Sequence, residues 1–194
     1  MQKDVYSVIQ SRRSIRRFQQ KPLDIKLLTT FVDAARIAPS AANLQPLEYM
    51  IINEKTLCEK VFPTLGWAGY IKPKWTPKES ERPTAYIIIL VKEDLKKYYK
   101  WDVGLAAENL MLLAEQNSIG SCLLLNINRE RLRSLLNIPE SLYIDAVVAL
   151  GYKAEKAIME DMQDSVQYYR DEQEILHVPK RKLKDIMHIN TYKT

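Results

Sequence analysis

The sequence predicts one domain of mixed helix and sheet, α+β or α/β, in which helices cover a sheet of four or five strands. Its 194 residues are enough for one hydrophobic core and few for two domains. Hydrophobic residues make up 46% of the chain and charged residues 27%, a composition typical of globular proteins. Segments with helical spacing of apolar residues alternate with short apolar runs, which indicates the mixed architecture.

A helix over residues 24–38 is the clearest element of the first half. Leu27, Leu28 and Phe31 follow helical spacing, Asp24 can cap the start, and Pro39 stops the helix. Around this helix we expect a helix over 4–10, a turn and short extended piece over 12–20, a strand over 48–53 and a short helix over 55–61.

Residues 62–83 form the least regular part of the chain. Four prolines and several aromatic residues interrupt any periodic pattern there, and irregular segments of this length inside a compact domain usually serve function. We therefore treat residues 62–83 as a candidate lid. The run AYIIILVK that follows, residues 85–92, is apolar throughout and predicts a central strand.

The helix predicted over residues 102–116 is apolar on most of its sides. Such a helix must be buried on most sides, and in a chain of this size a subunit interface is one way to bury it. After this helix we expect a strand over 121–125, a short helix over 129–136, a core strand over 146–150 and a polar, mostly helical or irregular tail from residue 153.

Several classes of protein and site are disfavoured by the composition. No apolar run reaches membrane-spanning length, and the first residues lack the apolar core of a secretory signal. Two cysteines, Cys58 and Cys122, are too few for a disulfide framework and predict a cytoplasmic protein. Because His177 and His188 are the only histidines, we expect no metal site and no Ser-His-Asp triad.

Positive charge is concentrated at the two ends of the sequence. Of the net charge of +5, residues 12–21 contribute +5 and residues 177–194 contribute +4, so the remainder sums to −4. This distribution suits either one compact anion site or a nucleic-acid surface. A nucleic-acid surface would interleave aromatic with basic residues, and the basic run at 12–21 has only Phe18, so we expect no nucleic-acid partner.

Two segments carry the chemistry that we expect. Arg12, Arg13 and Arg16, with the hydroxyl of Ser14, could surround a phosphate because planar guanidinium groups pair well with its oxygens. The uncharged loop 39–46 offers hydroxyl and amide groups that can both donate and accept hydrogen bonds. Taken singly, the first could be a solvated basic face and the second a polar turn. Together they indicate a cofactor that joins a phosphate to an aromatic ring.

These segments resemble the nitroreductase family of flavin-dependent oxidoreductases. The matching stretches occur in the family's order and cover nearly the whole chain, at residues 12–18, 38–46, 102–110, 119–122, 149–152 and 180–183. The resemblance implies an α+β three-layer fold whose central mixed sheet of four to five strands is flanked by helices. It also implies an intertwined homodimer in which residues 1–194 form one FMN-binding domain and the tail, 153–194, packs on the partner subunit.

The resemblance also implies which residues hold FMN. Those from one subunit, at the phosphate and ribityl side, would be Arg12, Arg13, Ser14 and Arg16. Those from the other subunit, at the flavin, would be Pro39, Ser40, Ala41, Asn43 and, with less support, Gln45. Backbone groups near Gly120 and Ser121 would lie along the ring, and Lys180 and Arg181 would close over the phosphate, with Lys182 as an alternative.

The implied reaction passes hydride from NAD(P)H to flavin N5 and then to an electron-poor acceptor, such as a nitroaromatic or a quinone, by a ping-pong mechanism. No side chain need act as a catalytic group. Trp67, Tyr70 and Trp75 could form an aromatic wall for the acceptor, or simply pack locally. Leu47 departs from the tryptophan that the family often has there. The alternatives are other FMN chemistry on the same scaffold, such as reductive dehalogenation or flavin degradation, and a flavin-binding protein without turnover.

Overall fold

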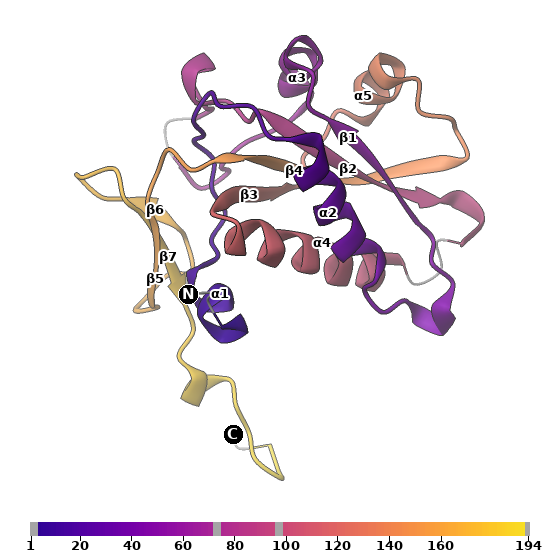
Figure 1. Cartoon of the computed structure of the whole chain (residues 1–194). Coiled ribbons are helices and arrows are strands. Elements are labelled where there is room, and N and C mark those ends of the chain that lie inside the picture. Colours follow the sequence, from indigo (N-terminus) through magenta and orange to yellow (C-terminus); the bar gives the residue numbers. More distant parts are fainter. Residues whose placement is uncertain (1–3, 72–74, 96–98, 193–194) are drawn as a thin grey trace.

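A four-stranded sheet forms the centre of the molecule. The computed structural model describes residues 4–71, 75–95 and 99–192. The strands β1 (Leu47–Ile52), β2 (Ala85–Lys92), β3 (Ile119–Leu124) and β4 (Leu142–Tyr152) lie in the order β1-β2-β4-β3 (Figure 1). The number of strands agrees with the prediction. All three pairings are antiparallel, however, so the expectation of mixed strand directions is wrong for these four strands.

Helices cover both faces of this sheet and complete the predicted three layers. On one face lie α2 (Ile25–Arg36) and α4 (Tyr99–Gln116), and on the other lie α3 (Lys55–Val61) and α5 (Arg129–Leu136) (Figure 1). The short α1 (Val5–Ser11) contacts α4. These helices and strands occupy the expected segments, with bounds that differ by a few residues, so the α+β class is confirmed.

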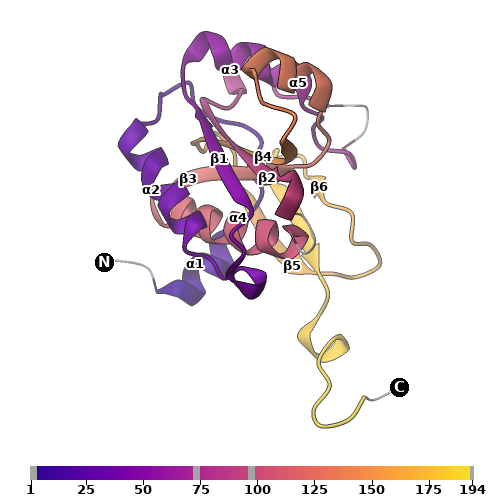
Figure 2. The same ribbon diagram turned by 90° about the vertical axis from the view of Figure 1, so that its right-hand side faces the viewer.

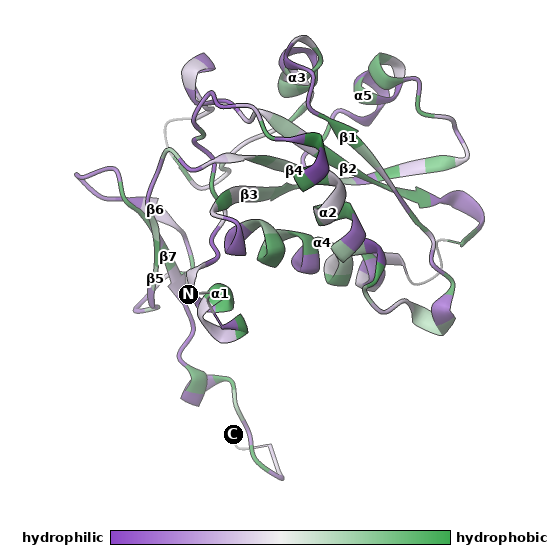
Figure 3. Ribbon diagram, in the orientation of Figure 1, coloured by the Kyte–Doolittle hydropathy of each residue, from purple (hydrophilic) through white to green (hydrophobic). Residues whose placement is uncertain are grey.

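Strand β2 explains why two hydrophobic cores share one sheet. Its side chains alternate in direction, so Ile88 packs with α3 and α5 while Ile87 and Ile89 pack with α2 and α4. All three side chains are fully buried. Figure 3 shows hydrophobic residues, in green, concentrated on the strands of the central sheet. The unbroken apolar run therefore marks a central strand, as predicted.

The tail differs from the prediction of a mostly helical or irregular segment. It contains a second sheet of three short strands, β5 (Ala157–Asp161), β6 (Tyr169–Arg170) and β7 (Leu176–Lys180), in the order β5-β7-β6. Leu176 is its anchor, because this side chain is fully buried and its amide donates to the carbonyl of Lys156 at 3.0 Å. Apart from Leu176, the residues of β5 and β7 are half-buried or exposed, which gives these strands too little apolar surface for recognition from sequence.

Beyond β7 the chain leaves the body of the molecule as an extended arm (Figure 2). One short 3-10 turn, Leu183–Asp185, is its regular element. The arm exposes large apolar side chains, among them Leu183, Ile186, Ile189 and Tyr192. Against the described part of the chain these side chains remain largely exposed to solvent.

The predicted irregular segment is irregular in the structure, although it is tied to the core. It contains two 3-10 turns, Phe62–Thr64 and Glu79–Glu81, and its residues 72–74 lie outside the described residues. The amide of Gly66 donates to the carbonyl of Asn126 at 2.8 Å. Among the helices that the structure describes, none is both long and apolar enough to cross a membrane.

Candidate functional site

The basic turn, defined here as residues 12–18, runs along the outer edge of β3. Ser14 forms a parallel bridge with Ser121, and the amide of Ile15 donates to the carbonyl of Ser121 at 2.9 Å. Glycine makes this approach possible, because a Cβ on Gly120 would lie 2.8 Å from a methyl carbon of Ile15. The structure therefore brings Gly120 and Ser121 together with the predicted phosphate-binding residues, where they hold the turn against the sheet.

Arg12 and Arg13, at the start of the basic turn, have partners within the protein. The Nε of Arg12 lies 2.9 Å from a carboxylate oxygen of Glu108 on α4. Arg13 is buried and points inward, where its guanidinium donates to the carbonyls of Arg12 and, at 2.6 Å, of Gln10. Burial, followed by the charge of Arg12, lowers the pKa of Arg13. Arg13 thus supports the backbone from which Arg12 and Arg16 project.

Arg16 is the arginine best placed to receive an anion. Within the described residues it forms no ion pair, and its Nε has no hydrogen-bond partner. Its guanidinium lies over the ring of Tyr168, 4.6 Å from the centroid. In contrast, the next residue, Arg17, pairs with Glu174 at 2.7 Å and with Glu81 at 3.6 Å.

A buried carboxylate that sequence reasoning missed braces the same turn. The side chain of Glu155 is 1% exposed and accepts hydrogen bonds from the amides of Arg16 and Arg17 and from the guanidinium of Arg170. A charge can be buried at this level when it is paired and hydrogen-bonded, as here. Nothing local distinguishes Glu155 from the other acids of the tail, so the sequence offered no signal for it.

The second predicted segment, loop 39–46, adopts a conformation that is unusual for its residues. A 3-10 turn, Ala41–Asn43, lies at its centre, and φ is positive at Ala42 (49°), Asn43 (54°) and Gln45 (49°). Residues other than glycine adopt such values rarely, and asparagine does so most readily. The surrounding structure must therefore hold the loop in place.

Asp102, at the start of α4, provides that support. It is 4% exposed and accepts hydrogen bonds from the hydroxyl of Ser40 at 2.6 Å and from the amide of Ala41 at 3.2 Å. The hydroxyl of Ser40 in turn accepts from the amide of Gln45 at 3.0 Å. Burial, with the nearby charge of Asp102, raises the pKa of Tyr49 to about 12. We did not assign Asp102 a role from sequence, although an acid opening an otherwise apolar helix was a usable signal.

A small groove of about 150 Å³ adjoins this loop. The predicted residues Pro39, Ser40 and Gln45 line it together with Tyr49 and Asp102. Asn43 and Gln45 are exposed, and the side-chain amide of Gln45 donates to the carbonyl of Asn43 at 3.3 Å. Ser40 is occupied in holding the loop. The loop thus presents polar groups at a fixed position on the surface.

The basic turn and the loop lie at opposite corners of one subunit. Ser121, beside the turn, pairs with Leu150, which pairs with Ala85 at one end of the sheet. At the other end, the amide of Lys92 donates to the carbonyl of Pro46 in the loop. The seven steps from residue 85 to residue 92 correspond to about 23 Å along the strand, and the three strand spacings from β3 to β1 correspond to about 14 Å. Figure 1 shows this separation, with β3 beginning on the left and the turn between α2 and β1 at the lower right.

The predicted aromatic residues divide into two groups. The guanidinium groups of Arg17 and Arg170 lie over Trp75 at 5.5 Å and 5.3 Å from its centroid. Tyr70 lies 5.2 Å from Tyr168, the ring that also stacks on Arg16. Trp75 and Tyr70 therefore border the basic turn. Trp67, in contrast, is buried and stacks on Phe62 at 5.5 Å.

The basic residues of the tail do not reach the basic turn within the described subunit. Lys180 ends β7 and is exposed, and the guanidinium of Arg181 donates to the carbonyl of Asp185 at 3.1 Å. Among the described residues, neither side chain shares a hydrogen bond or an ion pair with residues 12–18. In a single subunit, Lys180 and Arg181 therefore lie where β7 meets the arm, and not at the basic turn.

Comparison with known proteins identifies relatives of the chain. The model of the Nitroreductase family matches residues 9–152. A protein of Archaeoglobus fulgidus that carries the provisional name NADH dehydrogenase/NAD(P)H nitroreductase is 32% identical over 162 residues, covering 79% of this chain and 88% of that protein. An iodotyrosine deiodinase of Thermotoga neapolitana is 26% identical over 167 residues, covering 77% of this chain and 89% of that protein.

A solved structure confirms the fold at lower sequence identity. The crystal structure of a nitroreductase with bound FMN from Bacteroides fragilis matches with a TM-score of 0.67 at 22% identity. The match covers 84% of this chain and 95% of that one. Similarity of this kind establishes shared architecture, while the assignment of chemistry depends on the site residues.

Proposed function

Because the chain belongs to the nitroreductase family, we propose that it is an FMN-dependent oxidoreductase that uses NAD(P)H to reduce an electron-poor small molecule. Bound FMN would supply the redox chemistry, taking hydride at N5 and passing it to a nitroaromatic, a quinone or a similar acceptor in the same pocket, with ping-pong kinetics. The protein's part is to bind, orient and exclude water.

Arg16 supports the phosphate end of this proposal. Its guanidinium has no carboxylate partner among the described residues, while Glu155 fixes its backbone amide. A preorganised and unpaired arginine suits a phosphate because the anion meets paired donors that are already in position. We assign phosphate binding to Arg16, with Ser14 and Arg12 beside it, and a supporting role to Arg13.

Loop 39–46 supports the flavin end. We propose that Pro39, Ser40, Ala41, Asn43 and Gln45 contact the flavin. The bond from Ser40 to Asp102 holds the loop in a backbone conformation that it would otherwise leave. Rigid placement matters here, since a flat heteroaromatic ring is recognised by amides at fixed positions.

The separation of these two ends is the observation on which the proposed assembly depends. One ligand cannot be contacted by the turn and by the loop of the same copy across about 23 Å along the strands and about 14 Å across them. A symmetric dimer removes the difficulty, because the turn of one copy can face the loop of the other. The exposed apolar arm beyond β7 would pack on the partner subunit and carry Lys180 and Arg181 toward a phosphate.

Anaerobic reduction tests the proposal. Purified protein should absorb visible light as a flavoprotein, and NADH or NADPH added without oxygen should bleach that absorption. A nitroaromatic or quinone should then restore the colour. Colourless protein that takes up no FMN would contradict flavin binding, and bound flavin that neither nucleotide reduces would indicate a flavin carrier instead.

Reductive dehalogenation is the second candidate, since a deiodinase is among the relatives of the chain. A panel of acceptors given to the reduced protein separates the two activities. Rapid reoxidation by nitroaromatics or quinones supports the first proposal, whereas release of iodide from an iodophenol with slow nitro reduction supports the second. Because Tyr70 and Trp75 border the basic turn, their alanine variants should change the preference among acceptors more than FMN affinity.

A further inference from the structure

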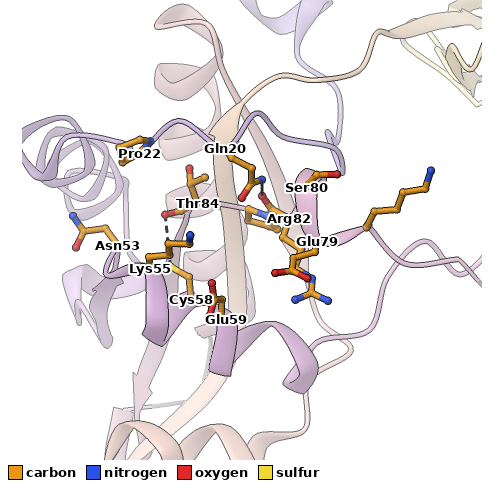
Figure 4. A pocket seen from close by; sticks show the side chains of 12 residues that line it. Gln20, Pro22, Asn53, Lys55, Cys58, Glu59, Glu79, Ser80, Arg82 and Thr84 are labelled. Atoms are coloured by element: carbon orange, nitrogen blue, oxygen red, sulfur yellow. Dashed lines mark hydrogen bonds between the residues drawn. The ribbon is translucent and has the colours of Figure 1, made fainter.

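A cavity of about 790 Å³ lies behind the basic turn and is separate from it. It opens between α3, residues 78–84 and the chain around Gln20 (Figure 4). Its volume falls in the range of small-molecule sites, roughly 300–1,000 Å³. Residues 78–84 lie between the basic turn and the cavity, and on the side of the turn the amide of Phe18 donates to the carbonyl of Glu81 at 2.9 Å. On the cavity side, the side chain of Gln20 donates to the carbonyl of Arg82 at 2.9 Å.

The charges of the cavity divide into a neutral rim and a positive floor. The rim carries two lysines and two glutamates, all exposed, so their charges cancel: Lys55, Lys78, Glu59 and Glu79. Arg82 is half-buried and, within the described residues, forms no ion pair. Its guanidinium carbon lies 4.3 Å from the centroid of the Phe62 ring, which limits its freedom. The floor thus holds one oriented positive charge.

Pro83 and Cys58 contribute uncharged, apolar surface to the lining of the cavity. Pro83 is buried, and Cys58 is 6% exposed. The Cys58 thiol lies 3.6 Å from the carbonyl of Thr84 and 3.7 Å from that of Ile52. Burial, assisted by Glu54 and Glu59, raises its pKa to about 12, so it remains a neutral thiol at physiological pH. Neutral sulfur and a proline ring favour the flat apolar part of a ligand.

We propose that this cavity is a second ligand site, which binds a small aromatic monocarboxylate. The carboxylate pairs with Arg82, and the ring lies against Pro83 and Cys58. Because the rim charges cancel, Arg82 supplies the net positive charge of the cavity, and a single carboxylate balances that charge. This site involves neither the basic turn nor loop 39–46.

The location of a heavy-atom ligand tests the site directly. Crystals of the flavin-loaded protein soaked with 4-bromobenzoate should show an anomalous bromine peak inside the cavity, with the carboxylate at Arg82. A peak found only elsewhere, or no peak at concentrations that saturate binding in solution, would overturn the proposal. This experiment needs no variant, so it stands even if substitution of Arg82 impairs folding.

Calorimetric titration with the same probe tests the role of Arg82. We expect Arg82→Gln to weaken 4-bromobenzoate binding at least about tenfold, because a charged hydrogen-bond partner is lost. Arg131→Gln removes an exposed arginine on α5 and should leave binding unchanged. The neutral 4-bromobenzamide should bind as weakly to the native protein as 4-bromobenzoate does to Arg82→Gln. Equal affinity of both variants for 4-bromobenzoate would reject the assignment.

Discussion

Arg16 differs from Arg12 and Arg17 because, among the described residues, its guanidinium has no carboxylate partner and lies over the Tyr168 ring. We predict that Arg16→Gln weakens FMN binding about tenfold or more, as expected for loss of a charged donor to phosphate. Its melting temperature without FMN should stay near that of the native protein. Arg17→Gln should bind FMN nearly as tightly as the native protein but melt at a lower temperature, since Arg17 pairs with Glu81 and Glu174. Fluorescence titration of apoprotein with FMN measures both affinities.

The exposed arginine on α5 supplies a control for the loss of one positive charge. Arg131→Gln should bind FMN as the native protein does. If Arg16→Gln and Arg131→Gln bind FMN equally well, the phosphate is not held by Arg16. That result would leave flavin binding itself intact and would redirect the assignment to Arg12 and Ser14.

The buried ion pair of Glu155 and Arg170 leads to a prediction about stability at the residue scale. The paired side chains of Glu155 and Arg170 are only 1% and 8% exposed, so Glu155→Gln leaves a buried cation without its counter-charge. Breaking such a pair costs about 3–5 kcal/mol, which urea unfolding of the apoprotein would measure. Glu172→Gln, at an exposed position of the same tail, should cost less than about 0.5 kcal/mol. Similar values for the two variants would contradict a bracing role.

At the scale of elements, local patterns explain which parts of the fold were predictable. Helix α2 shows its apolar face and its cap within the segment itself, where Asp24 accepts from the amide of Lys26 at 2.9 Å. Strand β2 is apolar at almost every position. The tail sheet has no such pattern, since its strands are short and half-exposed, and β5 finds its partner β7 across about twenty residues.

The same reasoning applies to the elements of the candidate site. The basic turn and loop 39–46 were visible because their composition is unusual over a few consecutive residues. Their supports were not, because Asp102 meets Ser40 across 62 positions and Glu155 meets Arg16 across 139. Sequence patterns therefore pointed to the groups that we propose contact a ligand, and not to the groups that hold them in place.

The tail sheet contains a histidine whose protonation should control its stability. His177 on β7 lies 2.7 Å from a carboxylate oxygen of Glu160 and 3.1 Å from one of Asp171, and it stacks on Tyr169. Hydrogen bonds to Glu160 and then to Asp171 raise the pKa of His177 above its ordinary 6.5. The bond to His177 lowers the pKa of Asp171 below 3.8. The tail sheet should thus be most stable between about pH 3.8 and pH 6.5, the ordinary pKa values of the two groups.

A raised histidine pKa fixes the direction of the effect. Its stabilisation is complete below pH 6.5 and is lost as the pH rises through the higher folded value. Hydrogen exchange of the β5 and β7 amides, corrected for the intrinsic rate, should therefore accelerate from pH 6 to pH 9. His177→Gln should remove this dependence. Amides of β2, in the central sheet, serve as the internal reference and should show no such change.

At the scale of the whole molecule, the proposed dimer would account for both the exposed arm and the separation of the basic turn from loop 39–46. Ile186 and Ile189 are 50% and 64% exposed, although each could bury its side chain in a dimer. We predict that the double variant Ile186→Asp, Ile189→Asp shifts the protein toward monomer in sedimentation equilibrium and lowers its flavin content. Val166→Asp changes another exposed apolar residue of the tail and should remain dimeric. Equal dimerisation of both variants would remove the arm from the interface.

Mixing two defective proteins tests whether each site draws on both copies. One variant carries Arg12→Ala and Arg16→Ala in the basic turn, and the other carries Asp102→Ala, which releases Ser40 and loop 39–46. In a mixed dimer both defects fall in one site and the other site is intact. Random reassortment of equal amounts should therefore restore about a quarter of the sites of native protein, measured as bound FMN and as reduction by NAD(P)H. If turn and loop of the same copy served one site, no mixture would recover either signal, and the apolar arm would need a different partner.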